Sequence, residues 1–228
     1  GHVPTSPLRE TLQWIRPMLL ITGFISLHAS IFYLVLTFSS TYLSEFLGFD
    51  PDTRLWMVML TGVVGAVVMP FGGMFTDRYG RRPFLLVVAV LSSGAMLWFF
   101  LAAPGATPGS FLAPMLAVGI CFGLYVSSTF AYTTELVPPQ VRTTVIGTAF
   151  NTTAAVFGGT APMIAAWIIT SSDNISLPWV YFVGTGALSI IALLCARDSD
   201  IERATAAAEA ATGSPAPQAD TQIETVPS

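Results

Sequence analysis

The sequence has no lysine, and only 10% of its 228 residues are charged. All nine basic residues are arginines, and they form no basic patch of the kind that binds nucleic acid. Its two cysteines, Cys121 and Cys195, lie in apolar runs at different depths, which indicates small core residues rather than a disulfide. No glycine loop precedes a Gly-Lys-Ser/Thr motif, which excludes an ATP-driven pump domain within this sequence. Without a metal-ligand cluster or a nucleophile–base pair, we expect no enzyme, no cofactor and no metal.

Apolar residues make up 53% of the sequence, and the mean hydropathy is +0.69. A soluble domain of this composition would expose large apolar patches, so we expect an integral membrane protein in contact with the lipid bilayer. The formal net charge of −4 indicates little about partners, because most acidic residues lie in the ends and loops.

Six apolar runs are long enough to cross a hydrocarbon core of roughly 30 Å as helices. They cover residues 17–44, 55–75, 84–103, 111–134, 145–170 and 179–196. We expect residues 1–16 to form a polar, cytoplasmic lead-in, and we expect no signal peptide among them. Residues 197–228 are rich in Ala, Pro, Thr and acids, which cannot bury a core, so we predict a disordered cytoplasmic tail. The predicted fold class is all-α, a polytopic membrane protein with six transmembrane helices.

The arginines are distributed unevenly over the loops. Six spans place both ends of the chain on one side, and eight of the nine arginines fall on that side; Arg54 alone falls opposite. Short arginine-rich loops stay in the cytoplasm. We therefore expect a plasma (inner) membrane protein with both termini cytoplasmic.

The densest charge cluster is Gly72-Gly73-Met74-Phe75-Thr76-Asp77-Arg78-Tyr79-Gly80-Arg81-Arg82-Pro83, between the second and third runs. Such charge does not lie in hydrocarbon, which predicts a short loop at the membrane surface. The spacing Gly-x-x-x-Asp-Arg-x-Gly-Arg-Arg resembles the cytoplasmic loop signature of the major facilitator superfamily. The alternative, a plain anchor loop, needs none of Gly73, Asp77 and Gly80.

Three further segments narrow the resemblance. The first run ends Thr41-Tyr42-Leu43-Ser44-Glu45-Phe46-Leu47, the fourth ends Glu135-Leu136-x-Pro138-x-x-x-Arg142, and the fifth contains Thr148-Ala149-Phe150-Asn151 and Gly158-Gly159-Thr160-Ala161-Pro162. Together they are similar to the C-terminal half of metabolite:proton symporters, which include proline/betaine, 2-oxoglutarate, shikimate and citrate permeases. The resemblance implies inverted three-helix repeats and a missing N-terminal six-helix half. The tail departs from osmosensing members, because it lacks a coiled-coil heptad pattern.

The resemblance also implies a function, namely secondary active transport of a small polar metabolite, a carboxylate or a zwitterion, by alternating access with proton symport. No basic residue within the spans is placed to bind a carboxylate, so that residue would belong to the missing half. Two alternatives are open: a uniporter or exporter of the same superfamily, and a six-helix remnant that transports nothing alone.

A polar stripe follows the first run. Its members recur every three or four residues and so share a helix face: Ser26, Ser30, Tyr33, Thr37, Thr41 and Ser44. In the resembled fold this helix lines the substrate cavity, which makes Tyr33 and Thr37 candidates for substrate contact. The alternative is a helix–helix interface held by small hydroxyl groups.

His28 is the one titratable side chain other than Cys and Tyr deep in a span. A histidine there is a candidate for carrying the coupling proton. However, it lies roughly 200° around the helix from Ser26, which favours a neutral histidine hydrogen-bonded to a neighbouring helix.

Two more residues are candidates for the cavity. Tyr125 is the deepest member of a polar face on the fourth run, and Asn151 lies on a polar face of the fifth. For Asn151 an interhelical hydrogen bond is an equal alternative. Gly158, Gly159 and Pro162 indicate either a hinge or close packing in the fifth run. A stripe of small residues on the second run, Gly62, Gly65, Met69 and Gly72, predicts tight helix packing.

The charges at the cytoplasmic ends predict a gate. Asp77 is placed to accept hydrogen bonds from the N-terminus of the fifth helix near Thr144, Glu135 to pair with Arg81 or Arg82, and Arg142 to pair with an acid of the missing half. The alternative is topology anchoring alone. The candidate gate residues are Gly73, Asp77, Arg78, Gly80, Arg81, Arg82, Glu135 and Arg142.

Overall fold

The structure is a computed structural model, and it describes residues 14–212, which form helices and no strand. The α-helices are α2 (Ile15–Tyr33), α3 (Ser39–Thr41), α4 (Pro51–Tyr79), α5 (Arg81–Leu101), α6 (Pro108–Glu135), α7 (Arg142–Thr153), α8 (Ala161–Ser172), α9 (Trp179–Cys195) and α10 (Asp198–Thr212). Three π-helical segments lie between them: η1 (Leu34–Phe38), η2 (Tyr42–Phe46) and η3 (Ala154–Gly159). Residues 1–13 of the predicted lead-in and 213–228 of the predicted tail lie outside the described residues.

The long helices have the dimensions of membrane spans. Five continuous stretches are long and apolar enough to cross a bilayer: Ile15–Phe46, Pro51–Tyr79, Arg81–Leu101, Pro108–Glu135 and Arg142–Ser172. The α9 helix has 17 residues, the lower limit for a span. It passes the same test when taken together with α10, from which it is bent by 64°. The molecule is therefore an all-α membrane protein.

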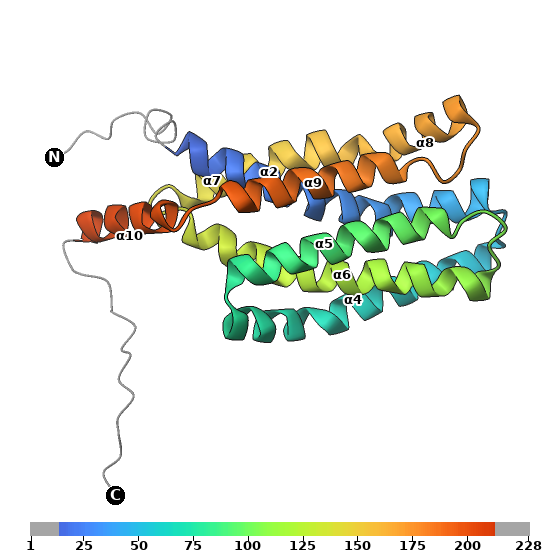
Figure 1. Ribbon diagram of the computed structural model, residues 1–228, viewed down its shortest axis with the longest axis horizontal. Coiled ribbons are helices and arrows are strands. Elements are labelled where there is room, and N and C mark those ends of the chain that lie inside the picture. The colour runs from blue at the N-terminus through green and yellow to red at the C-terminus, as the bar shows by residue number, and fades with distance from the viewer. Residues whose placement is uncertain (1–13, 213–228) are drawn as a thin grey trace, which may run out of the picture.

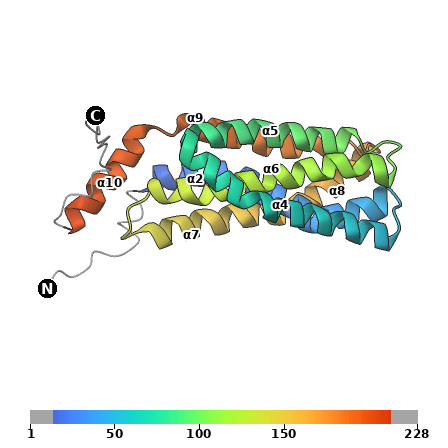
Figure 2. The same ribbon diagram turned by 90° about the horizontal axis from the view of Figure 1, so that it is seen from below.

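The helices pack side by side as an elongated bundle (Figure 1). The α2 helix begins, and α9 ends, at the same end of the bundle as the α4–α5 turn and the α6–α7 connection. This end carries Arg16, Arg81, Arg82 and Arg142 and is called the arginine end below. The α10 helix turns away from the bundle axis there (Figure 2).

The α4 and α6 backbones approach closely at two members of the predicted small-residue stripe, Gly65 and Gly72, whereas a Cβ added to Gly62 would have no neighbour within 4 Å. A Cβ added to Gly119 would lie 2.6 Å from the carbonyl oxygen of Thr61, and one added to Gly65 would lie 2.9 Å from the carbonyl oxygen of Gly119. A Cβ on Gly123 would meet the carbonyl of Gly65 more closely still. Only glycine allows this contact, which fixes α6 against α4.

Local sequence explains where α4 begins and ends. Asp50 caps its N-terminus by accepting a 2.9 Å hydrogen bond from the Thr53 backbone N–H, and Pro51 follows at the first helical position. This hydrogen bond holds the pKa of the Asp50 carboxyl below its usual range. The helix ends at Gly80, whose φ of 86° and ψ of 144° suit only glycine. The charge motif is therefore two helix ends joined by a single residue, not an extended loop.

The prediction of a disordered tail from residue 197 was wrong for residues 198–212, which form α10. Asp200 starts this helix by accepting a 3.0 Å hydrogen bond from the Arg197 N–H, and it forms a 2.9 Å ion pair with Arg16. Ala204 is buried on the same helix. Low complexity was interpreted as disorder, although alanine has the highest helix propensity of all residues.

Candidate functional site

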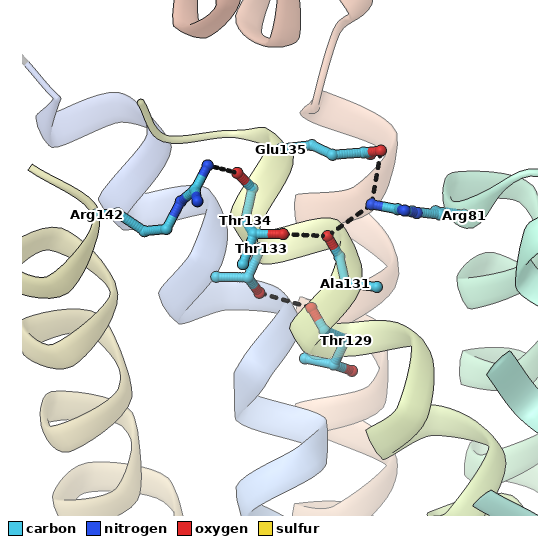
Figure 3. Close-up of polar contacts among 7 residues, drawn as sticks. All are labelled: Arg81, Thr129, Ala131, Thr133, Thr134, Glu135 and Arg142. Atoms are coloured by element: carbon cyan, nitrogen blue, oxygen red, sulfur yellow. Dashed lines mark hydrogen bonds and ion pairs between the residues drawn. The ribbon is translucent and has the colours of Figure 1, made fainter. Parts of the chain in front are cut away.

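Two arginines meet the C-terminus of α6 from opposite sides (Figure 3). From the α4–α5 turn, Arg81 Nη1 donates to the carbonyl of Ala131 at 3.0 Å and forms a 2.7 Å ion pair with Glu135. From the start of α7, Arg142 Nη2 donates to the carbonyl of Thr134 at 2.9 Å. Its Nε donates to the carbonyl of Val137 at 3.3 Å. Sequence reasoning left Arg81 and Arg82 open as partners of Glu135; the structure pairs Glu135 with Arg81.

The C-terminus of α9 is capped in the same way. Arg82 Nε and Nη2 donate to the carbonyls of Leu193 and Leu194 at 3.0 and 3.1 Å. Arg16 Nη2 reaches the carbonyl of Cys195 at 3.5 Å. Neighbouring arginines of one turn therefore hold the ends of two different helices, Arg81 that of α6 and Arg82 that of α9.

This arrangement follows from helix electrostatics. The last carbonyls of a helix lack partners within the helix, and the C-terminus carries a partial negative charge, so a guanidinium nearby is stabilising. Sequence reasoning missed these contacts, because it assigned the arginines to acidic partners only. The prediction that Arg142 pairs with an acid of another half stays a prediction, since here Arg142 caps α6.

Asp77 does not make the predicted contact. It is exposed at the end of α4 and accepts no hydrogen bond from any residue between 14 and 212, including those at the N-terminus of α7. It lines a hollow at the arginine end together with Arg81, Arg82, Tyr132 and Glu135. The hydroxyl of Tyr132 is buried and has no hydrogen-bond partner among residues 14–212.

Three further candidate gate residues lie near Asp77, with Gly73 and Arg78 inside α4 and Gly80 directly after it. Arg78 and Gly80 are exposed and Gly73 is half-buried. The Arg78 guanidinium lies 5.8 Å from the ring centre of Tyr79.

The predicted polar stripe on the first helix divides into two parts. Ser26 and Ser30 are fully buried, and Ser26 Oγ contacts the Thr185 carbonyl of α9 at 3.3 Å, which is the interface alternative. Thr37, in η1, is exposed. Tyr33 lies between these two cases: it is half-buried, with its ring against Gly158 of η3, where an added Cβ would lie 2.5 Å from ring atoms.

The prediction that Tyr125 lines a cavity was wrong. Its side chain is fully buried, and its hydroxyl bonds the Phe24 carbonyl at 2.8 Å and Ser189 Oγ at 2.6 Å. A further half packed onto this chain would only bury it more. Tyr125 therefore ties α6 to α2 and α9, and periodicity alone did not distinguish this buried face from a cavity face.

Asn151 differs from Tyr125, because it is exposed on α7 and its side-chain amide forms no hydrogen bond with another described residue. The predicted polar face continues on both sides of it, with Thr148 and Thr152 also exposed. The alternative of a hydrogen bond to a neighbouring helix is not seen within residues 14–212.

His28 lines a pocket of about 180 Å³ that is formed by α2, α7 and the first residue of η3. The pocket is lined by His28, Ala29, Phe32, Tyr33, Phe150 and Ala154. His28 is 6% exposed, and its Nδ1 has no hydrogen-bond partner among residues 14–212. The expected hydrogen bond from His28 to a neighbouring helix is therefore not found for this nitrogen; aromatic rings surround the imidazole instead.

Comparison with known proteins gives one family. A family model described as Major Facilitator Superfamily matches residues 20–223. The citrate-proton symporter of Salmonella typhi is 28% identical over 181 residues, which cover 77% of this chain and 41% of that protein. The proline/betaine transporter of Escherichia coli (strain K12) is 26% identical over 181 residues, covering 79% and 36%. The ectoine/proline transporter of Corynebacterium glutamicum is 27% identical over 184 residues, covering 81% and 36%.

A solved structure supports the fold. The chain is similar to the inward-open xylose transporter XylE from E. coli, with a TM-score of 0.55 and 17% identity, over 91% of this chain and 52% of that one. At this identity the likeness shows the fold alone. The chain spans less than half of the length of these three sequence relatives.

Proposed function

Since the chain belongs to the Major Facilitator Superfamily, we propose that it forms the C-terminal half of a secondary transporter. The transporter moves a small polar metabolite, a carboxylate or a zwitterion, by alternating access with proton symport. The printed names of the relatives support this class, because they include a citrate-proton symporter and a proline/betaine transporter. Their length supports the half, because this chain covers 36% to 41% of them.

The single observation that carries the proposal is Asn151, an exposed amide without a described partner on a membrane-spanning helix. Hydrocarbon tolerates such a group only against protein or in a water-filled cavity. Thr37 is exposed on the first span and raises the same requirement. A second six-helix half enclosing an aqueous cavity meets it for both residues.

The arginine end supports the gate proposal. The Arg81–Glu135 ion pair is only partly exposed, at 33% and 35% of the side chains, and it sits where two helix ends meet. Both residues belong to this chain, so in our proposal the rocking of two halves opens the pair by bringing a charge of the other half against it. We place this end, and with it both termini, on the cytoplasmic side of the inner membrane, in line with the positive-inside rule.

Uptake in proteoliposomes tests the proposal. The chain is joined to the N-terminal six helices of the Salmonella typhi citrate-proton symporter, and labelled citrate, proline and glycine betaine are offered with and without an inward proton gradient. We expect uptake of one of them that needs both the joined half and the gradient. Asn151→Ala should lower apparent affinity at unchanged protein level, whereas Val156→Ala, an exposed apolar control on the same span, should not.

Each other outcome selects an alternative. Uptake that ignores the proton gradient indicates a uniporter or exporter. No uptake by a correctly inserted chimera favours the six-helix remnant. If Asn151→Ala and Val156→Ala change the apparent affinity equally, Asn151 does not contact the substrate.

A further inference from the structure

No fixed charge lines the pocket at His28, in contrast to the hollow at the arginine end. Its polar side chains are the imidazole of His28 and the phenol of Tyr33; Phe32 and Phe150 supply two more rings. Ala29 and Ala154 leave the space open by their small size. In composition this pocket is similar to the aromatic cages that bind organic cations, and it differs from an anion-binding site.

Three phenylalanines fix the imidazole in place. The His28 ring centre lies 5.6 Å from that of Phe130, 6.0 Å from Phe122 and 6.1 Å from Phe150, at interplanar angles of 87°, 63° and 74°. The rings come from α6 and α7, so His28 joins three helices. None of these neighbours can accept or donate a conventional hydrogen bond to the imidazole.

The unpartnered nitrogen is the second observation. Nδ1 of His28 is buried and lacks a partner within residues 14–212, although a buried polar atom normally has one. Leaving such an atom unpaired costs free energy. Because Nδ1 itself is closed to solvent, a ligand in the pocket reaches the imidazole through its other nitrogen, Nε2. A neutral imidazole that carries its proton on Nδ1 accepts a hydrogen bond at Nε2.

We propose that this pocket binds the ammonium end of a small organic cation or zwitterion, with His28 Nε2 accepting a hydrogen bond from its N–H and the rings of Phe32, Tyr33 and Phe150 attracting its charge. Aromatic faces carry partial negative charge, which attracts alkylammonium groups. The same faces repel a carboxylate, and no arginine lines the pocket to neutralise one. The inference rests on the proposed transport function and narrows its substrate to one with a protonated nitrogen.

The size of the pocket agrees with a subsite rather than a whole binding site. At about 180 Å³ it is smaller than the roughly 300–1,000 Å³ of pockets that hold an entire small molecule. A secondary ammonium with its alkyl ring fits this volume. The remaining, acidic end of a zwitterion would extend toward the exposed side of α7, where Asn151 lies.

Nuclear magnetic resonance of the full chain in nanodiscs tests the inference without any transport step. The sequence contains two histidines, His2 and His28, so ¹⁵N-labelled imidazole gives few signals, and His28→Gln assigns them. Pyrrolidinium chloride is titrated at neutral pH beside two probes, sodium acetate and the neutral, similarly sized cyclopentanol. We expect saturable shifts of the His28 signals with pyrrolidinium alone.

The ring of Phe150 separates cation recognition from simple apolar filling. Phe150→Leu should weaken pyrrolidinium binding by about 3- to 30-fold, the range expected for losing one cation–π contact, and Phe150→Tyr should keep it. Circular dichroism and thermal melting of each variant check that the fold is retained. If Phe150→Leu proves unfolded, Phe32→Leu takes its place.

Several outcomes overturn the inference: equal shifts with acetate or cyclopentanol, no saturable shift with pyrrolidinium, or unchanged affinity in folded Phe150→Leu. The two proposals fail separately. If pyrrolidinium binds but the joined chain takes up no metabolite, the subsite is supported and the proposed transport function is ruled out. If a metabolite is taken up but pyrrolidinium leaves the His28 signals unshifted, the transport function is supported and the proposed subsite is ruled out.

Discussion

Gly80 is the whole connection between α4 and α5, and its backbone conformation decides what residue fits there. Its φ of 86° and ψ of 144° lie in a region essentially reserved for glycine. We expect Gly80→Ala to destabilise the chain by about 1–3 kcal/mol, the usual cost of such backbone strain. Thermal unfolding in detergent, followed by circular dichroism, measures the effect.

Gly73 provides the matched control, seven residues earlier in the same charge motif. It is inside α4, and a Cβ added to it would have no neighbour within 4 Å. Gly73→Ala should therefore be neutral or stabilising by up to about 1 kcal/mol, because alanine is the better helix former. Equal losses in both variants would contradict the assignment of Gly80 as the strained position.

Arg82 holds the end of α9 with two nitrogens, and a lysine offers only one point of contact. Arg82→Lys keeps the charge and removes the paired geometry to the Leu193 and Leu194 carbonyls. We expect faster amide hydrogen exchange in the last turn of α9, measured by mass spectrometry. Arg78→Lys, at an exposed arginine of the same motif, should leave that turn unchanged. Unchanged exchange in Arg82→Lys would mean that the contact does not hold the helix end.

At the residue scale, the sequence predicted which face of a helix carries polar side chains, but it did not predict which neighbouring helix that face contacts. Ser26, Tyr125 and Asn151 all follow helical periodicity, yet the first two are buried against other helices and the third is exposed. Periodicity reports an angle around one helix axis. Which helix lies at that angle depends on contacts between residues more than a hundred positions apart, such as Tyr125 and Phe24.

At the element scale the α4–α6 contact depends on glycine. A Cβ on Gly123 would overlap the Gly65 carbonyl, which belongs to a backbone that cannot move without separating the helices. We expect Gly123→Ala to cost about 1–3 kcal/mol or more, the range for overpacking. Gly62→Ala is the control on α4, since a Cβ there has nothing within 4 Å. Melting temperatures that fall equally in both variants would contradict this packing.

The apolar runs predicted the long helices but not the π-helical segments within them. Length and hydropathy suffice for a span, because a bilayer requires roughly 20 apolar residues. The π-helical segments η1 and η3 were not predicted, since a change in backbone hydrogen bonding leaves composition unchanged. They border the His28 pocket, as η1 begins directly after Tyr33 and η3 begins at Ala154. The glycines at 158 and 159 were the available signal.

At the scale of the whole molecule, the arginines gather at one end of the bundle. Arg16, Arg81, Arg82 and Arg142 lie where α2 begins and α6 and α9 end, whereas Arg54 lies in the first turn of α4 at the other end. Charge asymmetry orients a membrane protein during insertion, because basic loops resist translocation. The structure adds that these arginines also cap helices, so one set of charges has two roles.

Cysteine labelling of the intact chain in cells tests the orientation. Cys195 is exposed and Cys121 is buried, so Cys195→Ala leaves a background without an accessible thiol. In that background Asp52→Cys, at the end of the bundle opposite the arginine end, should react with an impermeant maleimide added outside. Arg197→Cys, at the arginine end, should react only after the membrane is opened. Both positions are exposed in the structure, so a difference in labelling reports sidedness rather than burial. Labelling of Arg197→Cys alone from outside would reverse the orientation, and the gate assigned to Arg81 and Glu135 would then face the exterior.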